Sequence, residues 1–123
     1  MEIINGCIVI SRSESPDPIH FGQPEAGGAY VAIIGVFQPG EPAPPFHIHP
    51  HTDEGFYIAN GQATFLLGDR EVTVTAGGFV FVPRGTPHTV WNSGVDAVRG
   101  LLVISPGDAE HEFIPADSLA QEP

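Results

Sequence analysis

The sequence has one cysteine, few positive charges and no lysine. Cys7 cannot form a disulfide within the chain because it has no partner. The basic residues are 4 arginines against 15 acidic residues, for a formal net charge of -11. Nucleic acids and anionic membranes both need clustered cations, so neither partner is expected. The absence of lysine also excludes Schiff-base chemistry, including that of pyridoxal phosphate.

Long apolar runs are absent as well. No segment approaches the roughly 18 consecutive apolar residues of a membrane-spanning helix. No charged and then apolar signal peptide opens the sequence. We therefore expect a soluble, cytoplasmic protein. Cys7 lies in the apolar run Cys7-Ile8-Val9-Ile10, where a buried and unreactive thiol is expected.

Glycine and proline, by contrast, are abundant, with 15 Gly and 13 Pro in 123 residues. Such a density of helix breakers excludes a helical bundle or a coiled coil. The chain is 41% hydrophobic, which is too apolar for a disordered protein. The composition therefore predicts an all-β fold, and the length predicts one domain over residues 1–123.

Short apolar or alternating runs recur between turn signals, and their spacing predicts a sandwich or barrel. Two hairpins are expected, at Asn60-Gly61 and at Gly68-Asp69. Residues 13–28 are expected to form a loop or extended arm, and the polar tail from Pro106 onward to pack loosely. The nine predicted strands are Ile3 to Ile10, Ala29 to Gln38, Phe46 to His49, Gly55 to Ala59, Ala63 to Leu67, Glu71 to Val74, Phe79 to Val82, Thr89 to Trp91 and Val98 to Ile104.

Histidines and a carboxylate are concentrated in the middle of the chain. Residues two apart on a strand face the same side, so His47 and His49 project together and can bind one metal ion. Glu54 begins the next predicted strand, where its carboxylate can reach the same centre. His88 follows the rigid turn Pro83-Arg84-Gly85-Thr86-Pro87 and is the candidate for a third imidazole.

Three neighbours of this cluster have open roles. Asp53 can take the place of Glu54 as the carboxylate ligand. His51 lies in the loop between ligands, where solvent exposure is expected rather than catalysis. Arg84 either steers an anionic ligand or faces the solvent.

Two stretches of the sequence resemble the paired motifs of the cupin superfamily. The first comprises Gly40, His47-Ile48-His49, Glu54 and Gly61, with one residue more than the family pattern between Gly40 and His47. The second matches the family at every spacing, at Gly77, Pro83, Gly85, His88 and Asn92. The resemblance spans residues 40–92.

The resemblance implies a single-domain cupin with the jelly-roll barrel, or double-stranded β-helix. The core barrel is then expected at about residues 29–105, with an N-terminal strand and arm at 1–28 and a C-terminal tail at 106–123. It also implies that His47, His49, Glu54 and His88 bind one divalent transition metal. The turns that hold these ligands are expected to depend on Gly61, Pro83, Gly85 and Asn92.

The donor set suits several metals, namely Fe, Mn, Ni, Co, Cu or Zn, and leaves the identity open. Phenylalanines placed on neighbouring strands predict an apolar pocket for an aromatic or hydrophobic small molecule. The alternative interpretation is that the same side chains simply fill the hydrophobic core. The candidate pocket residues are Phe37, Phe56, Phe65 and Val90.

The sequence is most similar to the single-domain bacterial cupins of the quercetin 2,3-dioxygenase-like group. That resemblance implies a dioxygenase in which the metal binds an aromatic, enolic or flavonol-like substrate, Glu54 serves as ligand and catalytic base, and O2 cleaves the ring. Two alternatives stay open: a non-oxidative polyketide cyclase or isomerase that uses a Lewis-acid metal, and a non-catalytic cupin that binds a small ligand. The family also implies a homodimer, with residues 3–10 as a pairing element.

Overall fold

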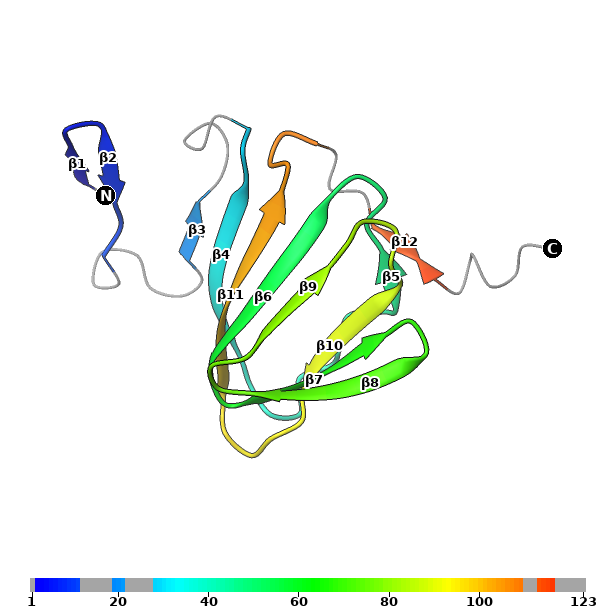
Figure 1. Cartoon of the computed structure of the whole chain (residues 1–123). Coiled ribbons are helices and arrows are strands. Elements are labelled where there is room, and N and C mark those ends of the chain that lie inside the picture. The colour runs from blue at the N-terminus through cyan, green and yellow to red at the C-terminus, as the bar shows by residue number, and fades with distance from the viewer. Residues whose placement is uncertain (1, 12–18, 22–27, 110–112, 117–123) are drawn as a thin grey trace.

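The computed structural model describes residues 2–11, 19–21, 28–109 and 113–116. These residues form three antiparallel sheets (Figure 1). The strands are β1 (Glu2–Ile4), β2 (Cys7–Val9), β3 (Ile19–Phe21), β4 (Val31–Phe37), β5 (His47–Ile48), β6 (Asp53–Asn60), β7 (Gln62–Leu67), β8 (Arg70–Thr75), β9 (Phe79–Val82), β10 (His88–Asn92), β11 (Val98–Ser105) and β12 (Ile114–Pro115).

Two five-stranded sheets make up the body of the molecule. One has the order β12-β5-β10-β7-β8 and the other the order β3-β4-β11-β6-β9. From β5 to β11 the chain passes repeatedly between the two sheets, so most neighbouring strands in a sheet are distant in sequence (Figure 1). This is the connectivity of a jelly roll, and it confirms the predicted all-β fold.

The core lies between the inner faces of the two sheets. On β9, Val80 and Val82 point inward, whereas Phe79 and Phe81 are 62% and 58% exposed. The period-2 alternation of a strand separates these two pairs. Phe65 on β7 is fully buried and is the largest side chain of the core. Its buried companions are Ile58, Ala63, Val80, Val82 and Val98.

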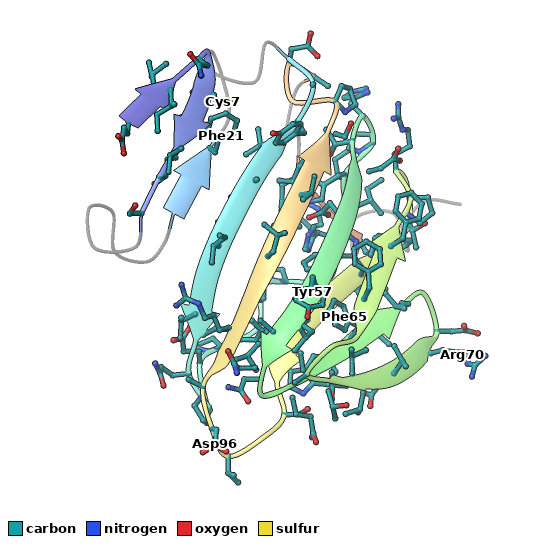
Figure 2. The ribbon with its side chains drawn as sticks, turned by 60° about the vertical axis from the view of Figure 1, so that its left-hand side comes forward. Cys7, Phe21, Tyr57, Phe65, Arg70 and Asp96 are labelled. Atoms are coloured by element: carbon teal, nitrogen blue, oxygen red, sulfur yellow. The ribbon has the colours of Figure 1, made fainter. Side chains whose placement is uncertain are left out.

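The hairpin predicted at Gly68-Asp69 is confirmed. β7 pairs with β8 up to Leu67 and Arg70, and Gly68 has a φ of 61°. Arg70 extends from the tip of this hairpin in Figure 2.

The hairpin predicted at Asn60-Gly61 is wrong, because β6 and β7 belong to different sheets. Gly61 alone of the two residues has a positive φ, 84°. A Cβ on Gly61 would lie 2.6 Å from the carbonyl oxygen of Ala97. Glycine is therefore required here for a corner between sheets rather than for a tight hairpin turn.

The N-terminal segment was expected as one strand, and this expectation is wrong. Residues 2–9 fold into the β1–β2 hairpin, with Asn5 and Gly6 at its turn at φ values of 51° and 80°. Asn-Gly with two positive φ angles is the usual two-residue turn of such a hairpin. Cys7 is exposed on it, so the predicted burial of its thiol is also wrong (Figure 2).

Both flanking segments contribute strands to the body. β3, within the predicted arm, pairs with β4 at the edge of its sheet. β12, within the predicted loose tail, pairs with β5 through Ile114 and Ile48, and Ala116 is buried. The expectation of a loosely packed tail is thus wrong for residues 114–116, while residues 12–18, 22–27 and 117–123 lie outside the described part. Within that part, no helix reaches the length and apolar character of a membrane span.

Candidate metal centre

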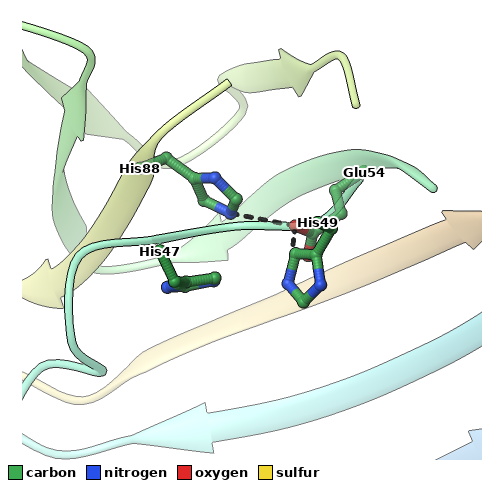
Figure 3. A group of neighbouring side chains, drawn as sticks. All are labelled: His47, His49, Glu54 and His88. Carbon is green, nitrogen blue, oxygen red and sulfur yellow. Dashed lines mark ion pairs between the residues drawn. The ribbon is translucent and has the colours of Figure 1, made fainter. Parts of the chain in front are cut away.

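Four side chains from both sheets converge on one point. His47 comes from β5, His49 follows that strand, Glu54 comes from β6 and His88 from β10. Each offers one ligand atom, and these atoms lie within 4.8 Å of one another. Figure 3 shows the three imidazoles arranged around the carboxylate. The structure therefore brings together every residue that the sequence predicted as a metal ligand.

Backbone pairing explains the convergence. His88 lies directly opposite His47 where β10 pairs with β5. The backbone N–H of Gly85 donates to the carbonyl of His49 at 2.9 Å, which fixes the turn before β10 against the end of β5. Strand alternation then directs His47, His49 and His88 to the inner face.

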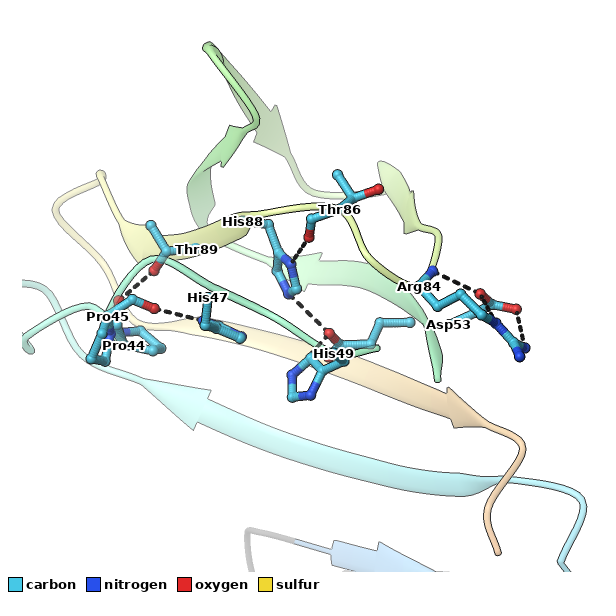
Figure 4. Close-up of polar contacts among 10 residues, drawn as sticks. Pro44, Pro45, His47, His49, Asp53, Arg84, Thr86, His88 and Thr89 are labelled. Carbon is cyan, nitrogen blue, oxygen red and sulfur yellow. Dashed lines mark hydrogen bonds and ion pairs between the residues drawn. The ribbon is translucent and has the colours of Figure 1, made fainter. Parts of the chain in front are cut away.

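The imidazoles are oriented by backbone carbonyls (Figure 4). Nδ1 of His47 lies 2.6 Å from the carbonyl of Pro45, and Nδ1 of His88 lies 2.9 Å from that of Thr86. With Nδ1–H donating to these oxygens, the Nε2 atoms are left to face the centre. This is the arrangement found around metal-binding histidines, where a second partner fixes the ring and its tautomer.

A threonine holds the proline-rich segment in place beside these rings. Thr89 is buried and donates from Oγ1 to the carbonyl of Pro44 at 2.6 Å (Figure 4). The carbonyl of the next residue, Pro45, orients His47. Thr89 therefore supports the metal centre although it does not face it.

Burial acts to lower the pKa of both His47 and His88, and only at His88 do the neighbouring groups outweigh it. Burial lowers the pKa of His47, and the neighbouring imidazoles lower it further, against the Pro45 carbonyl. Burial also acts to lower the pKa of His88, but the Glu54 carboxylate and the Thr86 carbonyl outweigh it and raise the pKa. A metal ion entering the cluster would therefore meet a neutral imidazole at His47 near neutral pH, and it would have to displace a more tightly held proton from His88.

The centre has the features of a site built for a cation. Oε1 of Glu54 lies 2.9 Å from Nε2 of His88 and 3.3 Å from Nε2 of His49. Nevertheless, Oε1 of Glu54 and Nε2 of His88 are buried without a hydrogen bond of acceptable geometry. Unsatisfied buried polar atoms are costly and point to a missing partner.

The spacing also fits a transition metal. Bonds of about 2.0–2.2 Å place ligand atoms up to roughly 4.4 Å apart, so the 4.8 Å cluster needs only a small contraction. Three nitrogens and one oxygen are a donor set for a divalent transition metal.

Asp53 and Arg84, whose roles the sequence leaves open, contact each other. Oδ1 of Asp53 accepts from the backbone N–H of Arg84 at 2.9 Å and from Nε at 3.1 Å, and Oδ2 accepts from Nη2 at 3.1 Å. Asp53 is thus occupied by Arg84 outside the cluster (Figure 4), and Glu54 is the carboxylate that belongs to the cluster. His51 is exposed and outside the cluster, as expected.

Phe113 is a site residue that the sequence did not reveal. Its ring stacks on His47 with centroids 4.1 Å apart and planes inclined by 19°, and it meets the His49 ring nearly at right angles with centroids 6.0 Å apart. It precedes β12, whose pairing with β5 brings it to the centre. The apolar pair Phe113-Ile114 in a polar tail was the available signal, but it carries no information about its partner.

The four predicted pocket residues line one cavity of about 200 Å³. Phe56 lies between this cavity and the metal centre, since its ring centroid is 5.2 Å from that of Phe65 and 6.4 Å from that of His88. None of the four candidate ligands lines the cavity itself. The cavity and the metal centre are therefore neighbours separated by the Phe56 ring.

Of the predicted turn residues, Pro83 and Gly85 lie in the turn before His88, whereas Asn92 lies at the other end of β10 and organises the turn after it. Asn92 donates from Nδ2 to the carbonyls of Phe37 and Asp96, and its Oδ1 accepts from the N–H of Gly94. Pro83 accepts through its carbonyl from the N–H of Thr86 at 3.2 Å. Gly85 has a φ of 81° at the turn that leads to His88.

Comparison with known proteins agrees with this architecture. Residues 33–105 match the family model described as the cupin domain. A curated relative, mannose-1-phosphate guanylyltransferase 2 of Escherichia coli O157:H7, is 28% identical over 88 residues, which cover 72% of this chain and 18% of the relative. The chain thus spans less than a fifth of that relative's length.

Solved structures show the same fold. An uncharacterized protein with a double-stranded β-helix domain from Klebsiella pneumoniae has a TM-score of 0.68 at 22% identity, over 86% of this chain and 96% of that one. Oxalate decarboxylase of Lactobacillus farciminis has a TM-score of 0.66 at 22% identity, over 85% and 32%. A DMSP lyase of Ruegeria pomeroyi has a TM-score of 0.58 at 28% identity, over 72% and 43%.

Proposed function

Because the chain belongs to the cupin family, we propose that it is a metal-dependent enzyme, and specifically a dioxygenase of a small aromatic or enolic substrate. The observation that carries the proposal is the buried cluster of three imidazoles and one carboxylate beside an apolar cavity. Such a cavity suits the flat apolar part of a ligand, while the cluster suits its oxygen atoms.

The candidate ligands and Phe113 would have different roles in this reaction. A divalent metal held by His47, His49, Glu54 and His88 would act as a Lewis acid toward an enol oxygen and, if redox-active, would support chemistry with O2. Glu54 is the carboxylate in contact with this centre, and it accepts the enol proton as general base. Phe113 covers His47 and limits the access of water from that side.

Oxygen uptake tests the proposal. The purified protein is stripped of metal, reloaded separately with Fe, Mn, Ni, Co, Cu or Zn, and supplied with single-ring enols or flavonols in air. We expect substrate-dependent uptake with at least one metal, its loss in Glu54→Gln, and its retention in His51→Ala, which removes an exposed imidazole outside the cluster. Absence of uptake with every metal would rule out the dioxygenase.

A non-oxidative reaction is the second candidate, with the metal as Lewis acid and Glu54 as base. It is favoured by the similarity to the DMSP lyase, at 28% identity over 72% of this chain, and it includes cyclase or isomerase chemistry on an enolisable substrate. Assays under strict anaerobiosis separate the two candidates. Full activity without oxygen selects the lyase, cyclase or isomerase, and loss of activity selects the dioxygenase.

We also propose that the protein is a cytoplasmic, single-domain homodimer. Support comes from the outer face of β6 and β9, where Tyr57, Phe79 and Phe81 are exposed. Large aromatic side chains gathered on one face are typical of protein interfaces. Light scattering on the eluting protein is expected to give twice the chain mass, and Phe79→Glu to give the monomer mass. A wild-type monomer at all concentrations, or a protein found outside the cytoplasm on cell fractionation, would contradict this assembly or location.

A further inference from the structure

Two facing glycines leave the sheet without side chains beside the cavity. Gly35 on β4 and Gly100 on β11 are paired directly across the two strands. The neighbouring pairs on the same face, Ile33 with Leu102 and Phe37 with Val98, carry full side chains. The row of inward-facing side chains across β4 and β11 therefore lacks its middle pair.

Gly35 faces this space with room to spare. A Cβ placed on Gly35 would have no atom within 4 Å, and no positive φ makes glycine necessary there. Its neighbour Val36 is exposed on the opposite face of the strand, so Gly35 points inward. Neither backbone conformation nor crowding thus explains a glycine at this position. At Gly100, by contrast, a Cβ would lie 2.8 Å from the carbonyl oxygen of Tyr57, so the close approach of the backbone already requires glycine there.

The walls of the cavity are almost wholly apolar. Interiors are close-packed, so an unfilled apolar hollow of this size suits the apolar part of a ligand. The lining residues are drawn from both sheets, chiefly Ile33, Phe37, Phe56, Phe65, Val90 and Leu102.

Two neighbours define the ends of the cavity. At one end, Phe56 separates it from His88 of the metal centre. At the other, a second hollow of about 280 Å³ shares the walls Phe37 and Val90 and is bordered by Pro42 and Pro44. Phe37 and Val90 are therefore walls common to the two hollows, which lie side by side.

We propose that Gly35, with Gly100 opposite, sets the size of the apolar group that the active site accepts and limits it to one aromatic ring or a branched chain of similar bulk. This inference rests on the proposed function in taking the cavity as part of the substrate site. A cavity of about 150 Å³ holds a benzene ring, so the roughly 200 Å³ available here suits one substituted ring. The three-ring skeleton of a flavonol exceeds it.

Binding of small phenols to the metal-free full chain tests the inference. We expect p-cresol to cause saturable shifts in the backbone amide resonances of residues 33–37 and 98–102, and 2-naphthol to bind at least tenfold more weakly. Gly35→Leu fills the space and is expected to weaken p-cresol binding at least tenfold. Ala59→Leu adds a similar bulk at an exposed position of the same sheet and is the matched control.

Other outcomes overturn the inference. They are a wild-type protein without saturable p-cresol binding, equal affinity for both phenols, or unchanged affinity in Gly35→Leu. If Gly35→Leu fails to fold, Gly35→Ala serves instead, with at least a threefold loss expected and no loss overturning the inference. Metal titration of each variant distinguishes the two proposals. If p-cresol affinity depends on the residue at position 35 but no variant binds metal, only the proposed function is refuted. If the variants bind metal but p-cresol affinity does not depend on that residue, only the size limit is refuted.

Discussion

Asp53 and Arg84 connect the two segments that carry the metal ligands. The carboxylate of Asp53 accepts two hydrogen bonds from the guanidinium of Arg84 and a third from its backbone N–H. Asp53 immediately precedes Glu54, and Arg84 lies in the turn before His88. The paired contact therefore fixes the start of β6 relative to the start of β10.

The Asp53–Arg84 pair is expected to give stability that depends on pH. The hydrogen bonds from Arg84 lower the pKa of Asp53 below its ordinary value of 3.8. A lowered pKa stabilises the folded state above the ordinary value, and that stabilisation is lost as the pH falls through the folded-state pKa. The melting temperature of metal-free Asp53→Asn should thus lie below that of the wild type at pH 6 and approach it below pH 3.8.

Thermal unfolding between pH 7 and pH 2.5 measures this difference. Asp69→Asn, at the exposed tip of the β7–β8 hairpin, is the control and should show no comparable convergence. A constant difference between Asp53→Asn and the wild type across the whole range would contradict the prediction.

Removal of one ligand should weaken metal binding far more than removal of a neighbouring imidazole. We expect Glu54→Gln and His88→Ala to lower the affinity for Zn or Co by roughly a hundredfold or more, because altering even the residues that support ligands costs about 10–100-fold. Isothermal titration of the metal-free protein measures the affinity. His51→Ala should bind as the wild type does, and equal affinities in all three variants would mean that the ion binds elsewhere.

Metal removal is expected to destabilise the wild-type fold. A ligand present at a hundred times its Kd adds about 2.7 kcal/mol to the free energy of unfolding. The melting temperature should therefore fall when a chelator is added to the metal-loaded wild type. In Glu54→Gln the chelator should have almost no effect, and a similar fall in that variant would contradict the assignment.

Phe113 is expected to tune the metal centre through its contact with His47. Aromatic stacking contributes about 0.5–1.5 kcal/mol, so Phe113→Ala should weaken metal binding roughly two- to tenfold and shift the visible spectrum of the Co-loaded protein. Phe113→Tyr keeps the ring and should restore both properties, whereas Phe113→Leu keeps only the bulk. If Leu restores the spectrum as well as Tyr does, the ring acts through packing and not through stacking.

Phe65 is expected to dominate the stability of the core. It is fully buried between the sheets, and truncation of a buried phenylalanine costs about 3–5 kcal/mol. Phe65→Ala should therefore lower the free energy of unfolding, measured with urea, by that amount. Val95→Ala removes an exposed side chain and should change it by less than about 0.5 kcal/mol. A small effect at Phe65 would show that the interior collapses around the missing ring.

The sequence predicted the candidate ligands because all four lie in the two motifs that resemble those of the cupin superfamily, and local geometry agrees with them. The alternation of a strand puts His47 and His49 on one side, and the turn at Gly85 leads directly to His88. None of these inferences required knowledge of which strands pair.

Features that depend on which strands pair could not be predicted from the sequence in the same way. Phe113 reaches His47 only because β12 pairs with β5. The corner at Gly61 could not be distinguished from a hairpin, since Asn-Gly suits both until the sheets are known. Gly35 and Gly100 are unremarkable alone, and they face each other beside the cavity only when β4 and β11 align them.

The ligands are divided between the sheets, with His47 and His88 on strands of one and Glu54 on a strand of the other. The donor set is complete only once the two layers have docked, because no single sheet holds all of it. An ion bound by all four residues would therefore link the two sheets. It should slow the opening of the folded protein while leaving the rate of its formation nearly unchanged, provided that docking comes after the folding transition state.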